Sequence, residues 1–165
     1  MARRLVPAPT VPLRRTAQIR VIYADTDRMG VVYHATYLRF LEHARVEFIR
    51  SLGFAYADME RMGFGLPVID LAVTYLIPAE YDDLVSVHVG LAKLTPARVH
   101  FAYELTVEPG DRRDFAGPDP LILLRAETHH GCMDMHDRRA TRLPDPVYEL
   151  LEGCLGNSKP APEPQ

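Results

Sequence analysis

The sequence predicts an α+β fold in which a five-stranded antiparallel sheet wraps around one long central helix. The expected elements follow the order strand, helix and then four strands, and only turns separate those last four strands. Strands joined by short turns pair antiparallel, because a parallel pair needs a long crossover connection. With 165 residues, 47% of them hydrophobic, the chain is long enough for one domain with a substantial core.

The first expected element is a half-buried strand at residues 17–24. Ile19, Val21 and Tyr23 alternate with other residues and so share one face of this strand. A loop that contains Gly30 follows, and we expect this glycine to let the backbone turn and approach a ligand closely.

A long amphipathic helix is predicted from Ala35 to about Leu52, because the apolar residues now recur at helical spacing. Gly53 stands where a helix usually ends. At 1.5 Å per residue this helix is roughly 27 Å long, enough to cross a small domain. A shorter helix is predicted at residues 56–62. The apolar face of the long helix comprises Tyr37, Leu38, Leu41, Ala44, Phe48 and Leu52.

Four further strands and a final helix complete the predicted fold. The strands are expected at residues 66–77, 84–94, 97–107 and 121–135, and the helix at 145–154. In the first strand the alternating residues are Ile69, Leu71, Val73, Tyr75 and Ile77. In the next two they are Val85, Val87, Val89 and Leu91, then Val99, Phe101, Tyr103, Leu105 and Val107.

The two ends of the chain differ from its body in composition. Three prolines interrupt residues 1–15 and three more stand within 157–165, so both segments are predicted to be disordered tails around a domain at 16–156. The net charge of −3 argues against nucleic acid as a partner. No apolar run is long enough for a transmembrane segment, and no export signal is evident, so a cytoplasmic location is expected.

The cysteines and histidines near the end of the last predicted strand do not indicate a metal site. Cys132 and Cys154 belong to no metal-binding motif, and we expect both to be reduced thiols. Alternate residues on a strand are about 6.6 Å apart along a line, whereas zinc requires all its donors within about 2.0–2.3 Å. The side chains concerned are His129, His130, Cys132, Asp134 and His136.

The motif Asp25-x-Asp27-x-x-Gly30 is the most informative stretch, and three interpretations compete. A calcium-binding EF-hand would need oxygen ligands where Met29 and Thr36 stand, which excludes it. A haloacid-dehalogenase phosphatase would need a small hydroxyl residue in place of Met29 and alternating strands and helices, and the absence of both from the predicted pattern makes this interpretation weak. The third interpretation is a carboxylate just before the N-terminus of the long helix, where free amides and the helix dipole stabilise an oxyanion. Such an arrangement is suited to acyl-group hydrolysis.

The stretch VIYADTDRMGVVYHATYLRFLEHARVEFIRSLGF, residues 21–54, resembles the acyl-CoA thioesterases of the hot-dog fold. Within that fold the sequence is most similar to the 4-hydroxybenzoyl-CoA thioesterase family and its Tol–Pal-associated branch. The similarity continues through residues 73–87, 93–105 and 125–144, and so covers about residues 17–152.

This resemblance implies hydrolysis of an acyl-CoA thioester and assigns roles to particular residues. Asp27 would be the catalytic carboxylate, acting as nucleophile or as general base. The backbone amide of His34 would polarise the thioester carbonyl, and the backbone at Gly30 would contact the substrate. Tyr33 and Tyr37 would line the acyl pocket.

The resemblance also implies partners and leaves alternatives open. Lys93 and Arg98 are candidates for binding the CoA phosphates, because cations on a pocket rim suit such groups. No metal or other cofactor is expected, since coenzyme A is part of the substrate; an acyl carrier protein is an alternative acyl donor. Members of the family form homodimers or homotetramers with active sites at an interface. A non-catalytic hot-dog module that binds an acyl carrier or partner protein is the alternative function.

Three further expectations concern residues around the motif. Asp25 is expected to be structural, capping or orienting the loop. Glu42 and Arg45 lie three residues apart on the long helix, so an ion pair is predicted between them. The segment 108–120 is longer than the tight turn that is usual in the family at this point.

Overall fold

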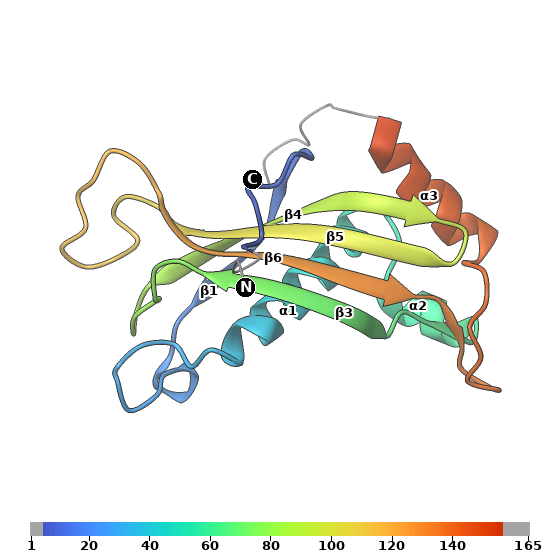
Figure 1. Cartoon of the computed structure of the whole chain (residues 1–165), viewed down its shortest axis with the longest axis horizontal. Coiled ribbons are helices and arrows are strands. Elements are labelled where there is room, and N and C mark those ends of the chain that lie inside the picture. The colour runs from blue at the N-terminus through green and yellow to red at the C-terminus, as the bar shows by residue number, and fades with distance from the viewer. Residues whose placement is uncertain (1–4, 157–165) are drawn as a thin grey trace.

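The computed structural model describes residues 5–156 and has two antiparallel sheets and three helices (Figure 1). The strands are β1 (Arg14–Arg20), β2 (Phe64–Gly65), β3 (Val68–Tyr75), β4 (Leu84–Thr95), β5 (Arg98–Val107), β6 (Leu121–Gly131) and β7 (Met133–Asp134). The helices are α1 (Thr36–Ser51), α2 (Tyr56–Arg61) and α3 (Asp145–Gly156), and a short 3-10 turn, η1, spans Tyr23–Asp25.

The large sheet has five strands in the order β1-β4-β5-β6-β3, and every neighbouring pair is antiparallel. Helix α1 lies against one face of this sheet (Figure 1). Strands β2 and β7 form a separate two-stranded ladder. The predicted fold class, a five-stranded antiparallel sheet with one long helix, is therefore confirmed.

The core lies between α1 and the central strands β4 and β5. All the residues predicted to share the inner faces of these two strands are buried, as the alternation of apolar residues indicates. On α1, Tyr37, Leu41, Ala44 and Phe48 are buried, and the Phe48 ring meets that of Phe101 edge-on at 5.9 Å. Leu38 is the exception at 37% exposure.

The first strand ends earlier than predicted. β1 stops at Arg20, not at residue 24, because the Asp25 carboxylate accepts the Ile22 N–H at 3.1 Å and the chain turns into η1. Tyr23 therefore leaves the predicted buried face; it is 75% exposed and stacks on Tyr81 at 4.0 Å. The alternating apolar pattern predicts a longer strand, but the hydrogen bond from the backbone to the Asp25 side chain ends it.

The boundaries of the predicted 66–77 and 121–135 strands were also wrong. β3 covers only Val68–Tyr75, and because it is an edge strand most of its side chains are exposed. The long last strand divides into β6 and β7, because the Cys132 N–H leaves the ladder and donates to the Ala97 carbonyl at 2.8 Å.

The segment predicted to be an N-terminal tail contacts the sheet. The Val6 N–H donates to Thr74 Oγ1 at 2.8 Å, and a side chain at Gly90 would lie only 2.5 Å from the Pro12 carbonyl. The ordered part therefore begins before residue 16, since apolar residues of this segment cover the sheet face. Residues 1–4 and 157–165 of the predicted tails lie outside the described residues.

None of the helices within residues 5–156 has the length and apolar character that crossing a membrane requires.

Candidate active site

Asp27 lies in a tight turn of the loop before α1. Its Oδ1 accepts the Met29 N–H at 2.8 Å, and its backbone N–H donates to the Val31 carbonyl at 2.9 Å. The Gly30 N–H donates to the Asp27 carbonyl at 3.0 Å, and the φ of Gly30 is +79°. Glycine adopts this left-handed conformation without the strain that a side chain would impose. Gly30 thus shapes the turn that holds the carboxylate.

A pocket of about 230 Å³ lies beside this turn, and Asp27, His34 and Tyr37 all line it. The loop, the start of α1 and the end of β3 thus bring three of the predicted site residues to one place. The rest of the wall is mainly apolar and comprises Met29, Val31, Val32, Tyr75, Leu76, Ile77 and Pro78. The arrangement combines one carboxylate with a largely apolar surface.

His34 lies in the turn that leads into α1. The helix begins at Thr36 with Ala35 as its N-cap, one residue later than predicted. The His34 carbonyl accepts the Tyr75 hydroxyl at 2.9 Å, whereas its N–H has no acceptor among residues 5–156. This free amide lies near the positive end of the α1 dipole, where an anion is stabilised.

The two predicted pocket tyrosines have different environments. Tyr37 is only 2% exposed, and its hydroxyl oxygen accepts the Ala79 N–H at 2.8 Å. Burial is the main cause that raises the pKa of Tyr37, so its phenol stays neutral near pH 7. Tyr33 is 46% exposed, packs its ring on His34 at 4.2 Å and does not line this pocket. Within one chain Tyr33 therefore does not line the Asp27 pocket, and its place in an acyl pocket stays a prediction.

The long 108–120 segment braces one wall of the site. Arg112 donates to the Asp83 carboxylate at 2.6 Å and to the Pro78 carbonyl at 2.8 Å, and it lies 3.6 Å from Glu80. Since Pro78 lines the pocket, this insertion holds the turn that forms the pocket wall. The sequence identified the length of the segment but contained no signal for this contact.

Lys93 and Arg98 lie far from Asp27 within one chain. Both are exposed near the turn between β4 and β5, whereas the Asp27 loop lies at the opposite end of the sheet (Figure 1). Lys93 stands nine positions after Leu84 on β4, which is roughly 30 Å of extended strand. The chain's own fold therefore does not bring these two cations to the Asp27 pocket, because both lie where β4 turns into β5.

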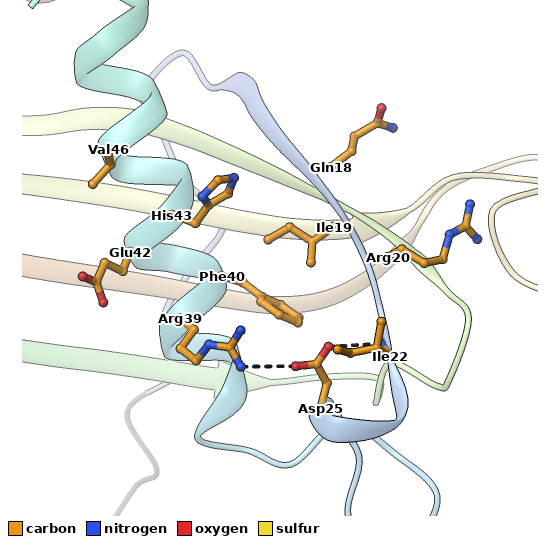
Figure 2. Close-up of a pocket in the computed structure, with 10 residues that line it drawn as sticks. All are labelled: Gln18, Ile19, Arg20, Ile22, Asp25, Arg39, Phe40, Glu42, His43 and Val46. Atoms are coloured by element: carbon orange, nitrogen blue, oxygen red, sulfur yellow. Dashed lines mark hydrogen bonds and ion pairs between the residues drawn. The ribbon is translucent and has the colours of Figure 1, made fainter. Parts of the chain in front are cut away.

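Asp25 faces a different hollow from Asp27. It is 3% exposed, and its carboxylate accepts the Ile22 N–H at 3.1 Å and an Arg39 N–H at 3.4 Å (Figure 2). Its backbone carbonyl also accepts the Tyr33 N–H at 2.9 Å. This hollow, an open groove of about 710 Å³ between β1 and α1, is separate from the smaller pocket. Asp25 makes the contacts of a residue that shapes the loop.

The candidate site contains no cluster of metal-binding side chains. Within the part of the chain that the structure describes, no group of three or more His, Cys, Asp or Glu side chains is arranged to hold a metal ion.

A sequence model of the thioesterase-like superfamily matches residues 21–151, well over half of the chain. This chain belongs to the thioesterase-like superfamily. The match includes the Asp27 loop, α1 and all strands of the large sheet except β1. The predicted assignment to a thioesterase family is confirmed at this level.

Named relatives and a solved structure agree with this family. The acyl-CoA thioesterase YbgC of Haemophilus influenzae is 32% identical over 130 residues, 78% of this chain and 88% of that protein. The 1,4-dihydroxy-2-naphthoyl-CoA hydrolase of Thermosynechococcus vestitus is 30% identical over 149 residues, 90% of this chain and 92% of that one. The crystal structure of DHNA-CoA thioesterase from Staphylococcus aureus has a TM-score of 0.74 at 30% identity, covering 88% of this chain and 95% of that one. The hot-dog fold and the enzyme class, a thioester hydrolase, are thus confirmed.

Proposed function

We propose that this thioesterase hydrolyses an acyl-CoA thioester to the free acid and CoA in the pocket beside Asp27. The observation that carries the proposal is that Asp27 and His34, whose backbone N–H has no acceptor within residues 5–156, both line one largely apolar pocket. Relatives at 30–32% identity are named for acyl-CoA hydrolysis, which supports the substrate class. The finer assignment to the Tol–Pal-associated branch of the 4-hydroxybenzoyl-CoA thioesterase family stays a prediction.

In the proposed mechanism the thioester carbonyl oxygen accepts the His34 N–H. The amide and the α1 dipole then stabilise the negative charge that develops on this oxygen. Asp27 either attacks the thioester carbon or removes a proton from the water that attacks it. In the nucleophilic route Asp27 forms a mixed anhydride as the carbon–sulfur bond breaks, and water then hydrolyses this anhydride to the product acid and the Asp27 carboxylate while a water proton goes to the CoA thiolate. In the general-base route Asp27 takes a proton from water, the water oxygen bonds to the carbonyl carbon, the carbon–sulfur bond breaks, and Asp27 returns the proton to the CoA sulfur.

Substitution of Asp27 by Asn tests this proposal. We expect D27N to fold normally and to lose about 10²–10⁴-fold in kcat/KM, because the amide neither attacks nor accepts a proton. The assay is release of CoA from a panel of acyl-CoA thioesters, followed with a thiol-trapping dye. The matched control is D58N, which removes a half-exposed carboxylate that pairs with Arg61 on α2 and with no other cation in the described residues. Normal turnover by D27N would overturn the mechanism, and acyl-CoA binding without any wild-type turnover would favour the non-catalytic module.

We also infer that the functional unit is a homodimer joined through β3. This edge strand pairs only with β6 and leaves its other side open in the described chain. Its exposed apolar side chains are Val68 at 54%, Ile69 at 52%, Leu71 at 38% and Tyr75 at 41%. An exposed apolar edge of this kind is a template for pairing with another strand.

Such a pairing would bring the two predicted phosphate-binding cations of one subunit toward the Asp27 pocket of the other. A twofold axis beside β3 reverses the direction of the partner's sheet, so the partner's β4–β5 turn lies toward this chain's Asp27 end. Lys93 and Arg98 of the partner subunit would then approach the CoA moiety, although the same residues of this chain do not. An acyl carrier protein in place of CoA, and the pairing of dimers into a tetramer, stay predictions.

A further inference from the structure

Arg45 is a buried cation without a carboxylate partner. It lies on the inner side of α1 at 8% exposure. The predicted ion pair with Glu42 is not formed, and no acidic residue pairs with Arg45 within residues 5–156. A buried charge is costly unless it is paired or hydrogen-bonded. The position of Arg45 therefore calls for an acceptor.

The neighbours of Arg45 do not supply enough acceptors. Arg45 Nη1 lies 3.0 Å from Nδ1 of His130, and that same nitrogen lies 2.9 Å from the Leu66 carbonyl. His130 Nε2 lies 2.8 Å from Thr128 Oγ1, which in turn lies 3.0 Å from the Tyr103 hydroxyl. Nδ1 can accept from Arg45 or donate to Leu66, but one ring nitrogen cannot do both.

The protonation state of His130 also limits the number of hydrogen-bond acceptors available to Arg45. Burial first, and the charge of Arg45 second, lower the pKa of His130 to about 4. The imidazole is therefore neutral near pH 7 and carries one N–H. In the tautomer whose Nδ1 donates to Leu66, Arg45 Nη1 still has Nε2 of His130 at 3.4 Å, so the ring offers Arg45 one acceptor in either tautomer. The other guanidinium nitrogens have no hydrogen-bond acceptor within residues 5–156.

The free nitrogens of Arg45 have open space in front of them. The guanidinium nitrogens of Arg45 that make no hydrogen bond are not fully buried, and Arg45 lines a cavity. That cavity measures about 240 Å³, room for about eight water-sized groups. Its other walls are mainly apolar and include Leu38, Leu41, Val68 and Leu71.

This cavity lies on the same seam between α1 and β3 as the Asp27 pocket. Tyr37 lines the Asp27 pocket and Arg45 lines the cavity, and Arg45 stands eight positions after Tyr37 on α1, a rise of about 12 Å. On β3, Tyr75 and Leu71 line the same two spaces and are about 13 Å apart. An acyl group held at Asp27 and laid along this seam reaches the cavity with its far end.

We propose that Arg45 is a specificity-determining residue that binds a carboxylate at the far end of the acyl chain, so that the preferred substrates are ω-carboxyacyl-CoA thioesters. This inference rests on the proposed function and names its substrate class. A carboxylate fits the guanidinium because it accepts two parallel N–H bonds. The apolar walls accommodate the methylene chain, and the distal carboxylate supplies the acceptor that the cluster lacks.

Glu42 distinguishes a carboxylate at the far end of the acyl chain from a hydroxyl group at the same place. Its exposed carboxylate lines the same cavity, where it repels a second carboxylate. A hydroxyl group would behave differently, because it donates to Glu42 while it accepts from Arg45. The two ligand classes therefore predict opposite effects of removing the charge of Glu42.

The test compares octanoyl-, decanoyl- and dodecanoyl-CoA with their ω-carboxy counterparts. Dissociation constants are measured in the D27N background, and KM and kcat in the wild type. We expect the wild type to favour the ω-carboxy compound at one or more lengths by about 10- to 100-fold, the range for a hydrogen-bonded charged pair. R45M should abolish this preference by raising Kd and KM for the ω-carboxy compounds.

Two further variants complete the design. E42Q should strengthen binding of the ω-carboxy compounds, and R50M, which removes an exposed arginine of α1 paired with Glu47, should leave the preference intact. No preference in the wild type at any length overturns the inference without any need for R45M to fold. Weaker binding by E42Q together with an unchanged R45M also overturns it. Absence of wild-type turnover with the affinity preference retained overturns the proposed function alone.

Discussion

At the scale of single residues, Asp27 uses only half of its carboxylate for local structure. Oδ1 accepts the Met29 N–H at 2.8 Å, while Oδ2 has no donor within the described residues. One oxygen thus orients the carboxylate, and the other is left without a donor, as the proposed role of Asp27 requires. An aspartate that only capped the turn would look similar in sequence, which is why the motif alone left both roles open.

His130 provides a prediction of pH-dependent stability. Its folded-state pKa of about 4 lies below the ordinary value of 6.5. Between these values the unfolded chain binds a proton that the folded chain excludes, so the free energy of unfolding falls as pH is lowered through this window. The loss approaches roughly 3 kcal/mol at the lower end. Urea denaturation at pH 7 and pH 4.5 measures it.

The comparison for this prediction is H130Q, which keeps hydrogen-bonding groups but does not titrate. Lowered pKa values of His88 and His100, both caused mainly by burial, act in the same direction in either protein. Only the difference between the two proteins therefore reports His130. Wild type and H130Q losing equal stability between the two pH values would contradict the assignment.

At the scale of elements, the end of α1 illustrates a boundary that local sequence determines. The helix ends at Ser51, and Gly53 follows with a φ of +94° and donates its N–H to the Arg50 carbonyl at 2.9 Å. Glycine favours this left-handed position, so the residue type predicts the stop. The start of α1 has no side-chain cap and was placed one residue too early.

The 108–120 segment leads to a prediction about stability. R112M leaves the Asp83 carboxylate, which is 1% exposed, without its cation. We expect a loss of about 3 kcal/mol in the free energy of unfolding, because a buried charge stranded by removal of its partner is strongly destabilising. Chemical denaturation followed by circular dichroism measures the change.

R113M is the matched control for R112M, since Arg113 is the exposed neighbour in the same segment. It should alter stability by no more than about 0.5 kcal/mol. We also expect R112M to raise KM for acyl-CoA, because the Pro78 wall of the pocket loses its brace. Equal stability of the two variants would show that Arg112 does not anchor the segment.

At the scale of the whole molecule, the exposed β3 edge predicts self-association. We expect the wild type to sediment as a dimer or larger species and I69K to sediment as an 18.6 kDa monomer. The reason is that a charge on an exposed edge strand opposes edge-to-edge pairing. Analytical ultracentrifugation measures the mass, and acyl-CoA turnover should fall with dissociation if each site needs both subunits.

M62K controls for charge on a surface apolar residue away from β3, since Met62 is 44% exposed beside α2. It should keep the mass and activity of the wild type. A wild type that is monomeric and fully active would refute the dimer, and with it the placement of Lys93 and Arg98 at the partner's site.

Periodicity determined most of the elements. The alternation through Val85–Val89 and the helical spacing from Tyr37 to Phe48 reflect which face must be buried, and this is written in consecutive residues. The motif at Asp27 and Gly30 was equally local, so it placed the candidate site at the start of α1. Interactions between residues close in sequence are sufficient to determine these helices, strands and turns.

Only the tertiary structure decided which distant residues meet. Arg45 and His130 are 85 residues apart, and Arg112 and Asp83 are 29 apart. The exposure of β3 follows from its place at the sheet edge, and the distance of Lys93 from Asp27 follows from the direction of β4. These features depend on strand order and register, which arise from long-range pairing. A single sequence therefore specifies which face of each helix or strand is buried and where the turns lie. The contacts between residues far apart in sequence are decided only in the folded chain.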